Sequence, residues 1–171
     1  MNRENPAVLA KEAIARALAG APSDTLPWET SLEGLFISLQ DAEGRVRASY
    51  GTSRAERGSG ELLARLARQA ASADPRFPPL EAEELAELSL KVWVLFEGRP
   101  FASLEALGPD DALRVERPPF SGVFLPENYM GEAWDPLSCL KQACRRAGLA
   151  AAAFQEEGVS VRVFSTRCFE A

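Results

Sequence analysis

The stretch from Gly34 to Thr52 reads GLFISLQDAEGRVRASYGT and has the pattern of a β-hairpin. Its first half alternates apolar residues with others, which is the period of a strand that packs one face on a core. Asp41–Gly44 then supplies polar turn residues and a glycine that can adopt positive φ. The alternation continues over Arg45–Gly51, where Arg47 and Ser49 fall on the polar side. We therefore expect a hairpin with one apolar and one polar face, and we expect function on the polar face.

Length and charge favour one domain, residues 1–171, that does not bind polyanions. The 171 residues are 46% apolar, and a domain of this size buries roughly 70% of its unfolded surface. The formal net charge is -6 without any basic run, so neither nucleic acid nor an anionic membrane surface is expected as a partner. The start of the chain lacks a secretory pattern, and no window has the roughly 18 apolar residues of a membrane span. A cytoplasmic location is the expectation.

The cysteines and the absence of histidine restrict the available chemistry. Cys139, Cys144 and Cys168 are scattered and odd in number, which fits reduced thiols better than a disulfide framework. Without histidine, the chain cannot itself supply a Ser-His-Asp or Cys-His mechanism or a zinc site containing histidine. Cys139 and Cys144 lie about 140° apart around their expected helix. We therefore expect no metal site from this pair and a place in the core for Cys144.

Caps and periodicity predict the remaining elements. Helices are expected between Asn5 and Gly20, over about 60–73, and from Pro136 to the glycine at 148. The run Asp74–Leu80, DPRFPPL, predicts a stiff extended connector. Besides the hairpin, the expected strands are 89–96, 113–116, 121–125 and 159–164.

Several of these segments together resemble the AMMECR-type domain family. The family signature Leu-Arg-Gly-Cys-Ile-Gly-Thr is met by VRASYGT at 46–52, where Arg47, Gly51 and Thr52 match. Ala48 and Ser49 stand where the family has glycine and cysteine. Further matches are the highly specific DPRFPPL run at 74–80, VWVL at 92–95 and CRRAGL at 144–149, so that the resemblance spans about residues 9–170.

The resemblance implies an α+β fold with antiparallel sheets flanked by helices. It also implies a larger lobe built from both chain ends, a smaller lobe from about residues 53–88, and a cleft between them. Microbial members of the family resemble components of a system with a Memo-type protein and a radical-SAM enzyme, so such partners are an expectation at the level of the family. No cofactor is implied.

The candidate site combines the polar face of the hairpin with the proline-rich connector. Arg47 can hold a carboxylate or phosphate through two parallel hydrogen bonds, or it can form an ion pair with Asp74 or another acid that pins the hairpin to the connector. Both alternatives stay open. Asp74 and Arg76 flank Pro75, and we favour a role in locking the turn of the connector over ligand contact.

Ser49, Thr52 and Glu127 complete the candidate set. A serine hydroxyl needs an adjacent base to act as a nucleophile, so a small residue fitted to a close-packed strand end is the favoured interpretation of Ser49. Thr52 enters as a residue that matches the family signature. Glu127 begins the polar loop 127–132, which offers oxygen ligands but is more simply a solvated loop.

Two classes of function follow. The first is a module that binds a small acidic ligand or a partner segment through Arg47, Ser49, Asp74 and Arg76 and supports the chemistry of another enzyme. The second is an enzyme in its own right, in which a carboxylate such as Asp74 or Glu127 acts as general base beside Arg47. No self-sufficient catalytic set is visible, which favours the binding module.

Overall fold

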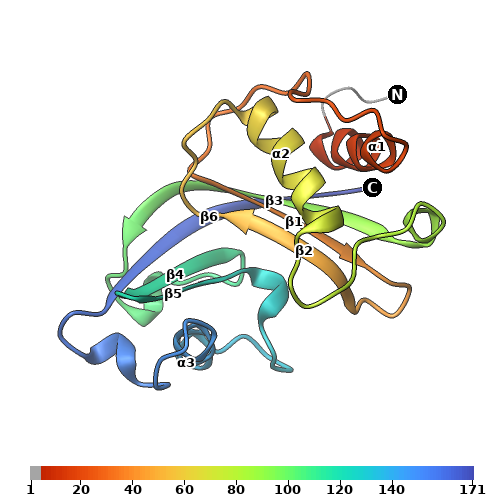
Figure 1. Ribbon diagram of the computed structural model, residues 1–171. Helices are drawn as coiled ribbons and strands as arrows, with labels where there is room; N and C mark the ends of the chain where they lie inside the picture. Colours follow the sequence, from red (N-terminus) through yellow and green to blue (C-terminus); the bar gives the residue numbers. More distant parts are fainter. Residues whose placement is uncertain (1–4) are drawn as a thin grey trace. The chain divides into compact units, whose positions relative to one another are not determined.

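A computed structural model describes residues 5–171, and its strands form one sheet in the order β2-β1-β3-β6-β4-β5 (Figure 1). The strands are β1 (Gly34–Gln40), β2 (Val46–Thr52), β3 (Ser89–Pro100), β4 (Asp111–Arg117), β5 (Phe120–Phe124) and β6 (Ser160–Glu170). The α-helices are α1 (Pro6–Leu18), α2 (Ser59–Ser72) and α3 (Pro136–Arg146). Short 3-10 turns are η1 (Glu84–Glu87), η2 (Leu104–Ala106), η3 (Pro126–Asn128) and η4 (Ala153–Gln155). The strands pair antiparallel and the helices flank them, which confirms the predicted α+β class.

The chain divides into two compact units. The first comprises the chain up to Val94 together with Cys168–Ala171, and the second comprises Leu95–Arg167. Residues 53–88, expected in the smaller lobe, all belong to the first unit. The predicted lobes and the cleft between them stay predictions, and residues 1–4 of the expected single domain lie outside the described residues.

In the first unit, α1 and α2 lie on the same face of β1 and β2 (Figure 1). The cap predicted for α1 is present, because the Asn5 side chain accepts a hydrogen bond of 2.9 Å from the Ala7 amide. Gly20 follows the helix with a φ of 78°. This is the left-handed conformation in which many helices end. Local capping rules therefore place α1 correctly.

The hairpin forms as predicted, with Leu39 paired with Ala48 and Ser38 paired with Ser49 across the two strands. The apolar side chains of β1 are fully buried. Ser38 on the opposite face is also buried, at 2% exposure, because β1 is an inner strand between β2 and β3. The polar face of the hairpin is therefore most accessible along β2, where Arg47 and Ser49 are partly exposed.

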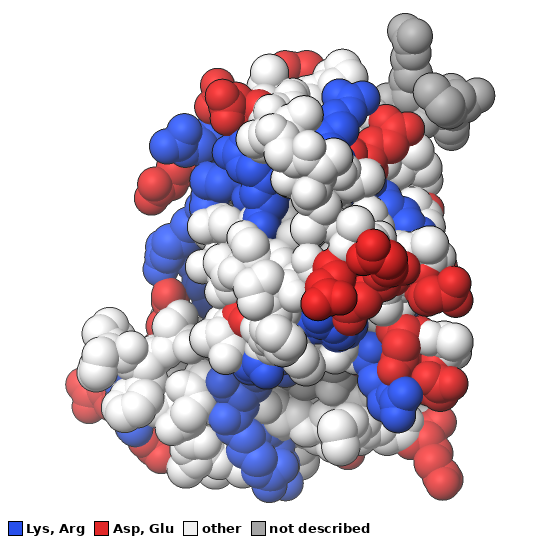
Figure 2. Space-filling view, turned by 45° about the vertical axis from the view of Figure 1, so that its right-hand side comes forward, with Lys and Arg blue, Asp and Glu red and all other residues white. Residues whose placement is uncertain are grey.

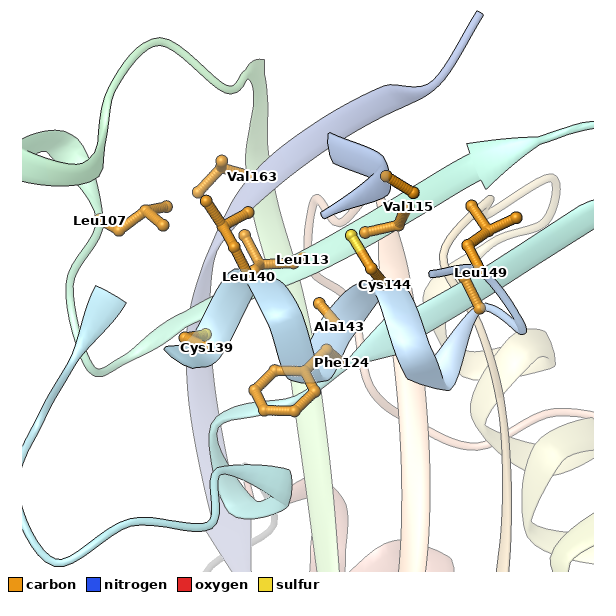
Figure 3. Packing of buried hydrophobic residues seen from close by; sticks show 12 residues of the cluster. Leu107, Leu113, Val115, Phe124, Cys139, Leu140, Ala143, Cys144, Leu149 and Val163 are labelled. Carbon is orange, nitrogen blue, oxygen red and sulfur yellow. The ribbon is translucent and has the colours of Figure 1, made fainter. Parts of the chain in front are cut away.

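In the second unit, α3 packs on β4 and β5 (Figure 3). Its cap Asp135 accepts a hydrogen bond from the Leu137 amide, as the sequence predicts. Leu140 and Cys144 point from the helix into a cluster of buried side chains, which confirms the core position of Cys144 (Figure 3). Other members of this cluster are Leu107, Leu113, Val115, Phe124, Cys139, Ala143, Leu149 and Val163.

Both edge strands of the sheet carry a side-chain cap. On β2, the Ser49 amide donates to Oδ2 of Asp74 over 2.8 Å. On β5, Nε of Arg146 donates to the carbonyl oxygen of Val123 over 2.8 Å. Unpaired edge groups are templates for unwanted strand pairing, so these two contacts protect the sheet as well as anchoring the segments that supply them.

The described helices lack the combination of length and apolar character that crossing a membrane requires.

Candidate functional site

Asp74 is the most buried polar residue of the candidate site, with only 2% of its side chain exposed. Its carboxylate accepts four hydrogen bonds. Three come from Arg76, from the backbone amide (3.0 Å), Nε (3.0 Å) and Nη2 (2.7 Å), and the fourth comes from the Ser49 amide (2.8 Å). The bonds from the Arg76 side chain, with those from the two amides, lower the pKa of Asp74 from 3.8 to about 2. Asp74 therefore fixes the turn of the connector and ties it to the edge of β2.

Arg76 reaches from this anchor towards solvent. Its side chain is 52% exposed, and its guanidinium carbon lies 5.3 Å from the ring centroid of Phe77. Two of its nitrogens are bound to Asp74, while Nη1 has no protein partner within residues 5–171. The preference for a turn-locking role is consistent with this geometry, yet one edge of the guanidinium remains available to a ligand.

Arg47 is less exposed, at 19% of its side chain, and its fork is occupied by Glu84. Nε donates to Oε1 over 2.9 Å and Nη2 donates to Oε2 over 2.8 Å, which is the bidentate arrangement of arginine with carboxylate. Nη1 donates to the carbonyl oxygen of Pro78 over 3.3 Å. The ion pair of Arg47 therefore forms with another acid, Glu84 of η1, rather than with Asp74, and its contact with the connector is the hydrogen bond to Pro78.

Ser49 contacts Asp74 through its backbone amide, while its hydroxyl has no hydrogen-bond partner in the described part of the chain. The neighbouring Ala48 is 2% exposed and lies opposite Leu39. The carboxylate that accepts from the Ser49 amide, that of Asp74, is already bound to the Arg76 side chain. No activated serine arises from this arrangement.

The other two candidates, Thr52 and Glu127, lie in different surroundings. The Thr52 hydroxyl accepts from the Arg54 amide over 3.1 Å and donates to the Arg54 carbonyl over 3.0 Å, so it closes the turn after β2. Glu127 lies in η3 of the second unit. The structure thus brings together Arg47, Ser49, Asp74 and Arg76 within the first unit.

Sequence reasoning missed Glu84 and Phe77. The Phe77 ring has both guanidinium groups near it, with the carbon of Arg47 at 5.9 Å and that of Arg76 at 5.3 Å from the ring centroid. Such distances are within the range of cation–π contact. The signal for Glu84 was the acidic run EAEELAE directly after the prolines, but any of its four glutamates fits that signal equally well.

Charges of both signs are interleaved on the face of the molecule seen in Figure 2. A ligand on that face meets local pairs rather than a broad field of one sign, so recognition by charge has to be local. The partly exposed guanidinium side chain of Arg76 is such a local feature.

The two buried thiols are poor nucleophiles. Burial raises the pKa of Cys139 to about 12, and it also raises the pKa of Cys144. Since the thiolate is the reactive form of cysteine, these residues serve packing. The residues described hold no group of three or more cysteine, aspartate or glutamate side chains arranged to bind a metal ion.

Acid should remove the contribution of Asp74 to stability. Its pKa is lowered in the folded protein, so the contribution is complete above about pH 4 and is lost as the pH falls towards 2. The loss should be about 2 kcal/mol in the free energy of unfolding. Urea unfolding between pH 5 and pH 2 measures it, with D74N as the reference that cannot titrate. If the difference between the wild type and D74N does not shrink in acid, folding does not lower the pKa of Asp74.

The architecture defines an α+β domain in which the edge of the hairpin is fastened to a proline-rich connector by the Ser49–Asp74 hydrogen bond, and to the turn η1 by the Arg47–Glu84 ion pair. The sequence profile of the AMMECR1 family matches residues 7–169 of this chain. The chain belongs to the AMMECR1 family.

Similar proteins occur in archaea. A protein of Thermofilum pendens is 31% identical, with 94% of this chain and 85% of that protein covered. A protein of Aeropyrum pernix is 33% identical, with 75% of this chain covered, and the chain spans only 60% of that protein's length. The crystal structure of the uncharacterized protein PH0010 from Pyrococcus horikoshii superimposes with a TM-score of 0.85 at 27% identity, covering 96% of this chain and 89% of that one. The fold is therefore shared with a solved structure.

Proposed function

We propose that this AMMECR1-family chain is a binding module that holds a carboxylate group, of a small acid or of an acidic partner segment, at the surface formed by Arg76, Phe77 and Arg47. The observation that carries the proposal is the half-exposed side chain of Arg76, whose Nη1 has no partner among the described residues. The hydrogen bonds to Asp74 hold that guanidinium in place before a ligand arrives. Such preorganisation reduces the entropy that binding has to overcome.

The chemistry of the neighbours suits a carboxylate. Arginine binds carboxylates through charge-assisted hydrogen bonds, and the Ser49 hydroxyl donates to no protein group among the described residues. Phe77 provides an apolar surface next to the guanidinium groups. These features favour a ligand with a carboxylate on a partly apolar frame.

The enzyme alternative receives less support from the same geometry. A general base near neutral pH works best when its pKa lies close to the working pH. Asp74 has a pKa of about 2, and its carboxylate already accepts four hydrogen bonds, three from Arg76 and one from the Ser49 amide. We therefore do not assign a catalytic role to Asp74.

The proposal retains the partners suggested by the family resemblance, a radical-SAM enzyme and a Memo-type protein. Either would present an acidic segment to the first unit while the chemistry takes place elsewhere. Co-purification of the full chain with each candidate, repeated with R76Q, tests this part directly. If R76Q retains either partner as well as the wild type does, the partner binds to another surface of the chain.

Replacing Arg76 with glutamine should weaken binding of an acidic probe about tenfold, because a charge-assisted hydrogen bond is lost. The probe is a fluorescently labelled tetraglutamate peptide, and the measurement is fluorescence anisotropy with the full chain at low salt. Circular dichroism verifies that the variant is folded.

The matched control is R57Q, which removes the same charge at a side chain that is 62% exposed. Arg57 precedes α2 and Arg76 follows it, so that the helix of 14 residues, roughly 21 Å long, lies between them in the chain. Equal losses of affinity in R76Q and R57Q would mean that the peptide senses only net charge, and the proposed site would be wrong.

A further inference from the structure

The carboxylate of Glu84 occupies Arg47 as a ligand would. Both of its oxygens are bound, at 2.9 and 2.8 Å, to the fork formed by Nε and Nη2. This is the geometry by which arginine recognises a carboxylate of any origin. Arg47 therefore forms an anion site that the chain itself fills.

Glu84 can leave this position by turning its side chain towards water, which also breaks the hydrogen bond of 2.9 Å that its Oε2 accepts from the Glu81 amide. Its side chain is 37% exposed, whereas that of Arg47 is 19% exposed, so Glu84 has the easier access to water. Leu85 within η1 and Leu80 and Leu88 on either side of it are buried, so apolar packing holds the turn in addition to the Glu84 carboxylate. A change of side-chain rotamer at Glu84 alone would open the fork.

The surroundings of Glu84 are acidic. Glu81, Glu83 and Glu87 lie within three residues of it and are exposed. The hydrogen bonds from Arg47 and from the Glu81 amide lower the pKa of Glu84. Its carboxylate is therefore charged at neutral pH and competes with any other anion for Arg47.

We propose that Glu84 is an internal occupant of the Arg47 site and is exchanged for a carboxylate of the ligand, so that the preferred ligand carries two carboxylates, one for Arg76 and one for Arg47. The second half of the statement follows from Phe77, whose ring lies within 6 Å of both guanidinium carbons. This inference rests on the proposed function, because it assumes that an acidic ligand binds at this surface. It adds the class of ligand and a way in which the site is closed in the free protein.

An internal occupant lowers the apparent affinity by the fraction of molecules in which the site is open. If one molecule in about ten is open, E84Q should bind the labelled tetraglutamate peptide about tenfold more tightly than the wild type. The matched control E83Q removes the same charge from the neighbouring exposed residue. E83Q should change the affinity by no more than about twofold, through net charge alone.

The outcomes separate the two proposals. If the wild type binds the peptide through Arg76 but E84Q and E83Q have equal affinities, the internal occupant is refuted and the binding module stands. If no variant binds the peptide, both proposals fail. Binding by E84Q that exceeds binding by E83Q and the wild type supports both.

A second measurement avoids the variants altogether, in case E84Q is poorly folded. In the wild type, the ¹³C signal of the Glu84 carboxylate should move towards the value of a free glutamate as the full chain is titrated with the peptide. The Nε–H signal of Arg47 should persist, because one carboxylate replaces another. Saturation with peptide that leaves the Glu84 signal in place would overturn the exchange.

Discussion

Replacing Asp74 with alanine should lower the free energy of unfolding by roughly 3 kcal/mol, because a buried carboxylate that accepts four hydrogen bonds is lost. The Ser49 amide loses its acceptor at the edge of β2, and the Arg76 guanidinium loses its partner. D74N, which keeps an oxygen acceptor without the charge, should lose about half as much. Equilibrium urea unfolding at pH 7 measures both effects, and hydrogen exchange should show faster exchange at the Ser49 amide.

The control for this prediction is D24A. Asp24 also pairs with an arginine, Arg68 at 3.0 Å, but its side chain is fully exposed at 100%. An exposed ion pair contributes at most about 1 kcal/mol. A loss in D74A no larger than that in D24A would show that the connector is held by its prolines and buried leucines rather than by the carboxylate.

Replacing Gly122 with alanine should cost roughly 2–3 kcal/mol, because the added methyl group overlaps with backbone atoms. A Cβ at this position of β5 would lie 2.6 Å from Cα and 2.7 Å from N of Ala147, at the end of α3. Neither atom can move aside as a flexible side chain can. The end of α3 would have to shift away from the strand, and the Arg146 bond to Val123 would be strained with it.

Gly108 in the same unit provides the control. The nearest atom to a Cβ there is Oδ2 of Asp111, at 3.8 Å, which is ordinary contact. G108A should be neutral or slightly stabilising, since alanine reduces the freedom of the unfolded chain. Equal stabilities of G122A and G108A in urea unfolding would mean that α3 does not rest on β5 as closely as the structure shows.

Much of the local structure was predictable from the sequence. The hairpin, the caps Asn5 and Asp135 and the glycine after α1 follow rules that involve only a few neighbouring residues. Strand bounds were harder, since β3 runs to Pro100 and β6 to Glu170, beyond the segments with clear alternation. Pairing with neighbouring strands extends such segments past the point where their own pattern ends.

The candidate site was predictable only in part. The sequence drew attention to Arg47, Ser49, Asp74 and Arg76, and these residues do lie together. It gave no indication that Phe77 lies near both guanidinium groups or that the Arg76 side chain is half exposed. Exposure depends on how the connector lies over β2, which no local pattern encodes.

The sequence by itself determined where the chain turns, which faces of its helices and strands are apolar, and that a rigid proline-rich connector follows α2. Those properties arise from backbone sterics and periodicity within a few residues. Only the tertiary structure decided which acid each arginine meets. Arg47 pairs with Glu84, 37 residues away, whereas Asp74 pairs with Arg76 two residues on. Many carboxylates satisfy the same charge rule, so the choice is made by the distances that folding sets.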